Sequence, residues 1–295
     1  MFSKNTHLIN KMSRNCMLFA VFVTIFIGNS IGILPPSRKA LPGEAPFMVR
    51  ISDGRKYCGG TIIRNNIILT AGHCVDNRDI DRLFVYAGTY NVYDTSRLFR
   101  HSVEQMLSHA NFRVGDNGVQ AFNDIGLIKL SKPLVMSDKI KAISWANVSF
   151  NVNSTLFGFG YTDDSYMSPA EFLRSTNVTL IPDAKCNKML ERTITKSIKE
   201  NYELCAESCA CNGDSGSPLI QIVDNEPKIV GITSWLADDL YGCRTPPAVF
   251  LKVADFNDWL LEKLKDLELD NVITEKTFNE PEMMNYRRRR FELNT

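Results

Sequence analysis

Short apolar, β-branched runs separated by turn residues fill the chain between residues 47 and 253. Examples lie at 61–69, 83–87 and 125–130. Many short strands of this kind are typical of an all-β sandwich or barrel. From 256 to 267 the apolar residues take helical spacing, so we expect a C-terminal helix that packs on the β core.

The beginning of the chain has a different pattern. Basic residues precede an apolar run at 16–27, and the small residues Gly28, Ser30 and Gly32 follow it, as in a secretory signal peptide. A run this short does not span a bilayer, which takes about 20 helical residues, so no stable membrane anchor is expected and a retained tether is the weaker alternative. Cleavage after Gly32 would leave Ile33 at the N-terminus, and cleavage after Gly28 or Ser30 is also open.

These patterns divide the chain into three parts. We expect a signal peptide at 1–32, a folded domain at 33–268 and a polar, disordered tail at 269–295, where no apolar periodicity is left to bury. The domain is long enough to bury a hydrophobic core.

Charge and cysteine content narrow the class of protein. The 34 basic and 33 acidic residues nearly cancel, apart from a basic run at 287–290, so no nucleic-acid partner is indicated. Eight cysteines in a chain with a signal peptide indicate disulfides rather than a zinc site. Asn-x-Ser/Thr sequons at Asn147, Asn153 and Asn177 agree with secretion into the extracellular space.

The strongest candidate for chemistry is the glycine-rich segment N-G-D-S-G-S-P at 212–218. Glycines let backbone amides turn toward a ligand. The amides of Gly213 and Ser215 are then placed to bind the oxyanion that forms when an acyl carbon is attacked. Ser215 is the candidate nucleophile.

A serine nucleophile needs a base, and the base needs a group that fixes its tautomer. His73, in the segment L-T-A-G-H-C at 69–74, is the candidate base. Asp124, in N-D-I-G-L-I at 123–128, stands at the start of an apolar strand and is the candidate orienting carboxylate.

Together these segments resemble, in order, the T-A-A-H-C, N-D-I-A-L and G-D-S-G-G-P motifs of the chymotrypsin family. The resemblance extends from about residue 46 to 259. It implies two six-stranded antiparallel β-barrels with a C-terminal helix, and a secreted serine endopeptidase with His73, Asp124 and Ser215 as its triad. The implied partners are protein or peptide substrates and protein inhibitors, with no cofactor and no metal; the oligomeric state is left open.

The family pattern also implies three disulfides. They are Cys58 with Cys74, Cys186 with Cys205, and Cys211 with Cys243. Cys209 has no family partner, so a free thiol, another partner or an intermolecular link are open for it.

The chain departs from the family in its specificity pocket. Cys209 stands at the pocket floor, where trypsin-like enzymes need a negative charge, although Glu207 is close enough in sequence to intrude. Leu236 and Ala248 replace the usual wall glycines, while Ser234, Trp235 and Leu236 would line the substrate strand. We therefore expect cleavage after small or apolar residues; the alternative is a non-catalytic homologue that acts as a binding or decoy module.

The activation motif also differs. The family places a new N-terminal ammonium on the aspartate before the nucleophile, here Asp214. Counting back along the chain puts that terminus at Ile33 or Leu34, and the residue directly before it is not basic. We expect signal cleavage itself to expose this terminus, without a separate zymogen stage.

Overall fold

The computed structural model describes residues 37–150, 152–161, 169–193, 200–207, 210–237 and 247–277, with side chains as far as residue 268. All of them belong to the second of two compact units of the chain, Ile31–Thr295.

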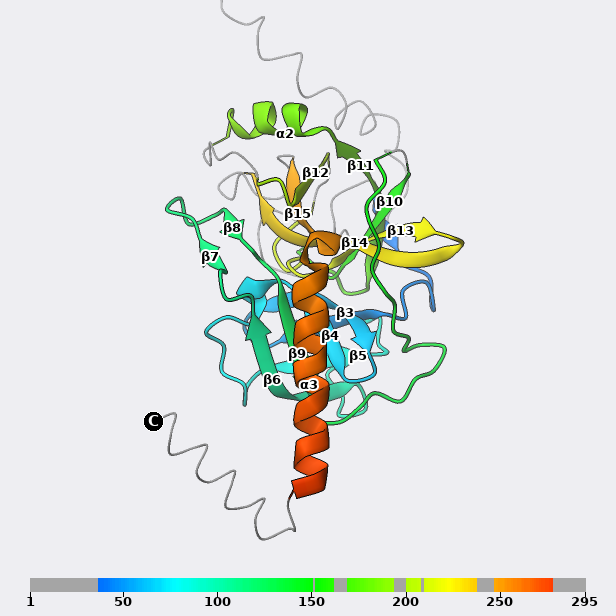
Figure 1. The fold of residues 1–295 in the computed structure, drawn as a ribbon. Helices are drawn as coiled ribbons and strands as arrows, with labels where there is room; N and C mark the ends of the chain where they lie inside the picture. The colour runs from blue at the N-terminus through cyan, green and yellow to red at the C-terminus, as the bar shows by residue number, and fades with distance from the viewer. Residues whose placement is uncertain are drawn as a thin grey trace, which may run out of the picture. The chain divides into compact units, whose positions relative to one another are not determined.

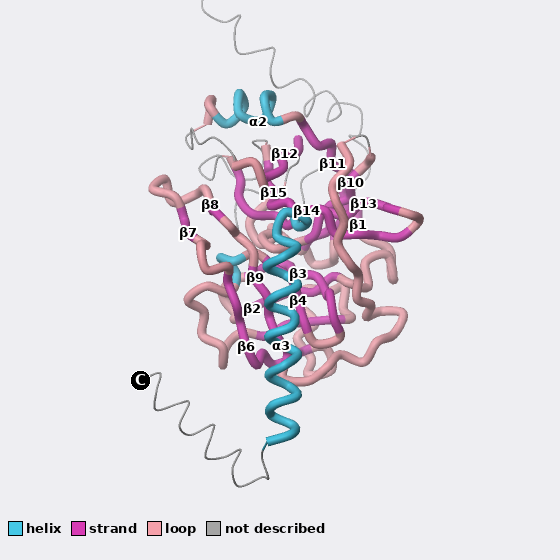
Figure 2. The backbone as a smooth tube through the Cα atoms, in the orientation of Figure 1, coloured by secondary structure: helices cyan, strands magenta, loops and turns pink. Residues whose placement is uncertain are grey.

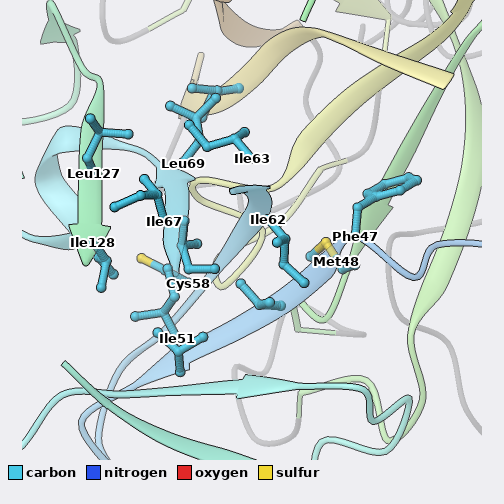
Figure 3. Close-up of a cluster of buried hydrophobic side chains, with 14 of the residues drawn as sticks. Phe47, Met48, Ile51, Cys58, Ile62, Ile63, Ile67, Leu69, Leu127 and Ile128 are labelled. Carbon is cyan, nitrogen blue, oxygen red and sulfur yellow. The ribbon is translucent and has the colours of Figure 1, made fainter. Parts of the chain in front are cut away.

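Six antiparallel strands close into a first barrel (Figure 1). In barrel order they are β2 (Met48–Ser52), β3 (Tyr57–Arg64), β4 (Ile67–Thr70), β9 (Gly126–Leu130), β6 (Arg100–Ser108) and β5 (Phe84–Ala87). Their β-branched and aliphatic residues fill the barrel, and Ile62, Leu127 and Ile128 are fully buried (Figure 3). Burying such side chains stabilises the fold by about 1.5–3 kcal/mol each.

Six further strands form a second antiparallel barrel. They are β11 (Arg174–Ile181), β10 (Ser154–Gly158), β13 (Pro218–Val223), β14 (Glu226–Leu236), β15 (Ala248–Lys252) and β12 (Glu203–Glu207), and β12 pairs back with β11 to close it. The short β1 (Arg38–Lys39) adds to the outer side of β11. The predicted pair of six-stranded barrels is confirmed.

Short helices and one hairpin complete the domain (Figure 2). They are η1 (Gly72–Cys74), α2 (Asp183–Leu190), η3 (Val253–Phe256), and the hairpin of β7 (Arg113–Val114) with β8 (Ala121–Phe122).

The predicted C-terminal helix is α3 (Asn257–Thr277), whose Leu260, Leu264 and Leu267 pack into the core that contains the first barrel. The helix continues through 269–277, the first part of the segment for which a disordered tail is predicted. These residues contain no proline or glycine, and a helix nucleated by packing propagates through such a segment. Within the described part of the chain, no helix has both the length and the hydropathy to cross a bilayer.

Candidate active site

Strand pairing in the first barrel brings His73 and Asp124 together. The last residue of β4, Thr70, pairs with the first residue of β9, Gly126. His73 follows that point on one strand and Asp124 precedes it on the other, so the two side chains meet. His73 Nδ1 lies 2.8 Å from Asp124 Oδ2, and the His73 backbone N–H donates to Asp124 Oδ1 at 2.8 Å.

The carboxylate of Asp124 is fully buried and receives a third hydrogen bond from the second barrel. The donor is the hydroxyl of Ser234 on β14, 2.5 Å from Asp124 Oδ2. The preceding residue, Asn123, has a left-handed backbone with φ of 49°. Its backbone N–H donates to the Tyr202 hydroxyl and its side-chain amide to the Asn111 carbonyl, so five hydrogen bonds fix the turn that presents Asp124.

The two groups shift each other's pKa. Burial lowers the pKa of His73, but the charge of Asp124 and the hydrogen bond to it outweigh burial and raise that pKa above its ordinary value. The charges of Arg78 and Lys56 act in the lowering direction. Burial raises the pKa of Asp124, but His73 and Ser234 lower it to a net value below its ordinary range. Asp124 is therefore the anion of the pair.

Ser215 lies in the same cavity as His73. The cavity holds about 400 Å³ and is lined by Lys56, His73, Val114, Gly118, Val119, Ala121, Cys211, Asn212, Ser215, Thr233, Ser234, Trp235 and Leu236. The His73 side chain is 29% exposed there, which leaves it accessible to a substrate. No hydrogen bond joins the Ser215 hydroxyl to His73; such catalytic bonds are often long without substrate.

The loop around Ser215 depends on two glycines with left-handed backbones, Gly213 (φ 92°) and Gly216 (φ 79°). A Cβ on Gly216 would come within 2.2 Å of Thr70 Oγ1, so only glycine fits. The Ser215 carbonyl accepts a 2.7 Å hydrogen bond from the Gly59 N–H, which ties the loop to β3. The nucleophile candidate is thus held between the two barrels.

Comparison with known proteins decides the family. The family model described as Trypsin matches residues 36–260, most of the chain. The chain belongs to the trypsin family. It is 30% identical over 254 residues to Lectizyme of Glossina austeni, covering 81% of this chain and 89% of that protein. It is 29% identical over 259 residues to Kallikrein 1-related peptidase-like b4 of Mus musculus, covering 82% and 98% respectively. The chain is accordingly a serine endopeptidase, a hydrolase whose substrates are proteins.

Two of the disulfides implied by the resemblance are present in this trypsin-family domain. Cys58–Cys74 joins β3 to η1 beside His73, and Cys186–Cys205 joins α2 to β12. Cys211 is also disulfide-bonded; its predicted partner Cys243 lies outside the described residues. Sulfurs joined in the Cys58–Cys74 bridge offer no thiolate to a metal.

Asp214, the residue before the nucleophile, is a fully buried carboxyl group. It accepts hydrogen bonds from the backbone N–H groups of Gly160 (2.8 Å) and Cys211 (2.9 Å). Burial raises its pKa to about 7, against the lowering effect of these two bonds. No basic side chain of the described residues forms an ion pair with it, and the candidate partners Ile33 and Leu34 lie outside them.

The predicted substrate-binding residues divide into two groups. Ser234, Trp235 and Leu236 line the cavity, whereas Ala248 is fully buried in the apolar cluster against which Leu236 packs and is not among the lining residues. Ala248 pairs with Leu236 across the sheet, and its role as a pocket wall stays a prediction. Cys209 lies outside the described residues.

Two cavity features were missed from the sequence. Lys56 lines the cavity from the β2–β3 loop, and the β7–β8 hairpin contributes Val114, Gly118, Val119 and Ala121. An Asn-Gly pair at 117–118, a recognised turn signal, would have predicted the hairpin but not its place over the site. Glu207, considered as an intruding charge, is instead exposed and forms an ion pair with Lys185 on α2.

Proposed function

We propose that Ser215, His73 and Asp124 form the catalytic triad of a secreted serine endopeptidase. The observation that carries this proposal is the buried Asp124 carboxylate, which holds the ring and backbone of His73 at 2.8 Å each, in the cavity that Ser215 lines. A carboxylate in this position fixes the imidazole tautomer and stabilises the imidazolium.

In this mechanism the Ser215 hydroxyl attacks the scissile carbonyl while His73 accepts its proton. The amides of Gly213 and Ser215 bind the resulting oxyanion. His73 then gives the proton to the leaving amine as the C–N bond breaks, which leaves an acyl-enzyme on Ser215. Water, deprotonated by His73, hydrolyses this ester, and the proton returns to Ser215.

We further propose cleavage after small or apolar residues rather than after Arg or Lys. Leu236 reaches into the cavity from the end of β14, and none of the described lining residues is acidic. A basic side chain there would lose hydration without a counter-charge. The test is a set of peptide substrates that differ only in the residue before the scissile bond; preferred cleavage after Arg or Lys would contradict the proposal.

Signal cleavage after Gly32 would supply the charge that Asp214 needs. Strand β1 pairs with one edge of β11 and β10 with the other edge, and β10 ends at Gly158, close in sequence to Gly160, whose amide donates to Asp214. Ile33 precedes Arg38, the first residue of β1, by a segment that reaches up to about 17 Å when extended. N-terminal sequencing of the secreted protein tests this; a terminus after Arg38 or Lys39 would contradict it.

Secretion is also supported by the three sequons. Asn147, Asn153 and Asn177 are all exposed, as glycan attachment requires. We expect the secreted protein to lose mass on treatment with an N-glycan-releasing enzyme. Replacing all three asparagines with glutamine should abolish that change.

Covalent labelling tests the enzymatic proposal directly. A fluorophosphonate probe should label the processed protein at Ser215, and Ser215→Ala should abolish labelling and peptide hydrolysis while the protein stays folded. Pure protein with the expected N-terminus that fails to label would favour the alternative, a homologue that binds without cleaving.

A further inference from the structure

A buried carboxylate contacts the tryptophan of the substrate-side strand. Glu203, on β12, is 1% exposed, and its Oε1 accepts a 2.8 Å hydrogen bond from the indole Nε1 of Trp235 on β14. Its Oε2 accepts the backbone N–H of Glu200 at 2.6 Å. Strand β15 lies between β12 and β14, so this bond reaches across an intervening strand.

The Trp235 ring separates the core from the catalytic cavity. It is 4% exposed and belongs to an apolar cluster with Val249, Ala121 and the Cys186–Cys205 disulfide. Trp235 and Ala121 also line the cavity, together with Val119, which packs against the same cluster. Dispersion contacts favour burial of the ring but are not directional, whereas the bond to Glu203 fixes its orientation.

A carboxylate is an unusual choice at this position if only stability is at stake. Its neighbour on β12, Leu204, and its cross-strand partner on β15, Leu251, are apolar and buried. Burying a carboxylate loses hydration, and replacing buried polar groups with well-packed apolar ones is often neutral or stabilising. The acidic side chain is therefore better explained by what it holds in place.

We propose that Glu203 is a positioning residue for substrate binding, which fixes the indole of Trp235 as a wall of the site for the acyl half of the substrate. The inference rests on the proposed endopeptidase function. An extended peptide that pairs with β14 would pass Trp235, with Val119 and Ala121 lining the same cavity. Glu203 therefore affects the binding of one part of the substrate, an apolar side chain at least two residues before the scissile bond.

The test compares substrates of two lengths in three variants. Glu203→Gln keeps an acceptor for the indole, Glu203→Leu removes it, and Glu226→Leu is the matched control, an exposed carboxylate at the far end of β14. With an apolar tetrapeptide substrate, Glu203→Leu should raise KM about tenfold. KM for a single-residue ester with the same leaving group should stay within about twofold, and Glu203→Gln should restore tetrapeptide binding.

Fluorophosphonate labelling comes first, so that two failures are distinguished. Wild-type protein that does not label overturns the endopeptidase proposal and this inference with it. If the variants label but Glu203→Leu affects both substrates equally or neither, only the role of Glu203 is overturned. If Glu203→Leu does not fold, Trp235→Phe removes the donor instead and must give the same length-dependent rise in KM.

Discussion

The hydroxyl of Ser234 bonds directly to the carboxylate of Asp124, at 2.5 Å, although the two residues belong to different barrels. Ser234→Ala leaves a fully buried carboxylate with one donor fewer. We expect kcat/KM to fall by about one to two orders of magnitude, since losing one hydrogen bond to a buried charged group costs about 1.5–3 kcal/mol.

Steady-state kinetics with an apolar tetrapeptide measure this loss. Ser144→Ala is the control, because Ser144 is exposed and its hydroxyl accepts a hydrogen bond from Lys228. Full activity in Ser234→Ala would show that the bond does not help to hold Asp124.

The charge of Lys56 should shift the pH at which activity is lost on the acid side. The base must be neutral, so kcat/KM falls as the pH drops through the pKa of His73. The Lys56 charge lowers that pKa, and Lys56→Met should therefore raise it and move the acid limb of the pH profile to higher pH. The same shift in Arg55→Met, an exposed neighbour outside the cavity lining, would contradict a local effect of Lys56.

Asp214 should make stability depend on how the N-terminus is made. Its pKa in the folded chain is about 7, above the ordinary value of 3.8. Between these two pH values the folded chain therefore keeps a proton on Asp214 that the unfolded chain releases. In a chain with its leader retained, the free energy of unfolding should fall as pH rises from 4 to 7, by about 4 kcal/mol at most. Once an N-terminal ammonium pairs with Asp214, the pKa drops and this decline disappears.

Urea unfolding of the two forms at several pH values measures the difference. Asp214→Asn removes the titrating group and should abolish the decline in the leader-retaining form. A decline of equal size in both forms would mean that the new terminus does not reach Asp214.

Ser217 has a buried hydroxyl with no hydrogen-bonding partner among the described residues. Its backbone, by contrast, is well bonded, since its carbonyl accepts both the N–H and the hydroxyl of Thr233. Ser217→Ala removes only the unsatisfied group and should raise the free energy of unfolding by about 1 kcal/mol. Calorimetry measures this; a loss of stability would indicate that the hydroxyl has a partner in solution.

Much of this site follows from local sequence. The sequence pattern predicts the apolar runs that form β4 and β9. His73 and Asp124 flank the paired ends of these two strands. The glycines around Ser215 are likewise readable, because left-handed backbone and close approach leave few other residues. Short motifs on regular elements thus predict both the barrels and the residues brought together.

The sequence pattern does not predict contacts between segments that are far apart along the chain. Nothing local to Glu203 indicates that it faces Trp235, since the bond depends on strand order in a closed barrel. Lys56 and Val119 enter the cavity through loops whose paths depend on tertiary packing.

The division of the proposed triad between the two barrels has a consequence for biosynthesis. His73 and Asp124 come with the first barrel, whereas Ser215 and Ser234 come later, with the second. A growing or partly unfolded chain therefore carries no assembled hydrolytic apparatus. In the proposed mechanism, peptide hydrolysis therefore requires that both barrels are folded and docked on each other.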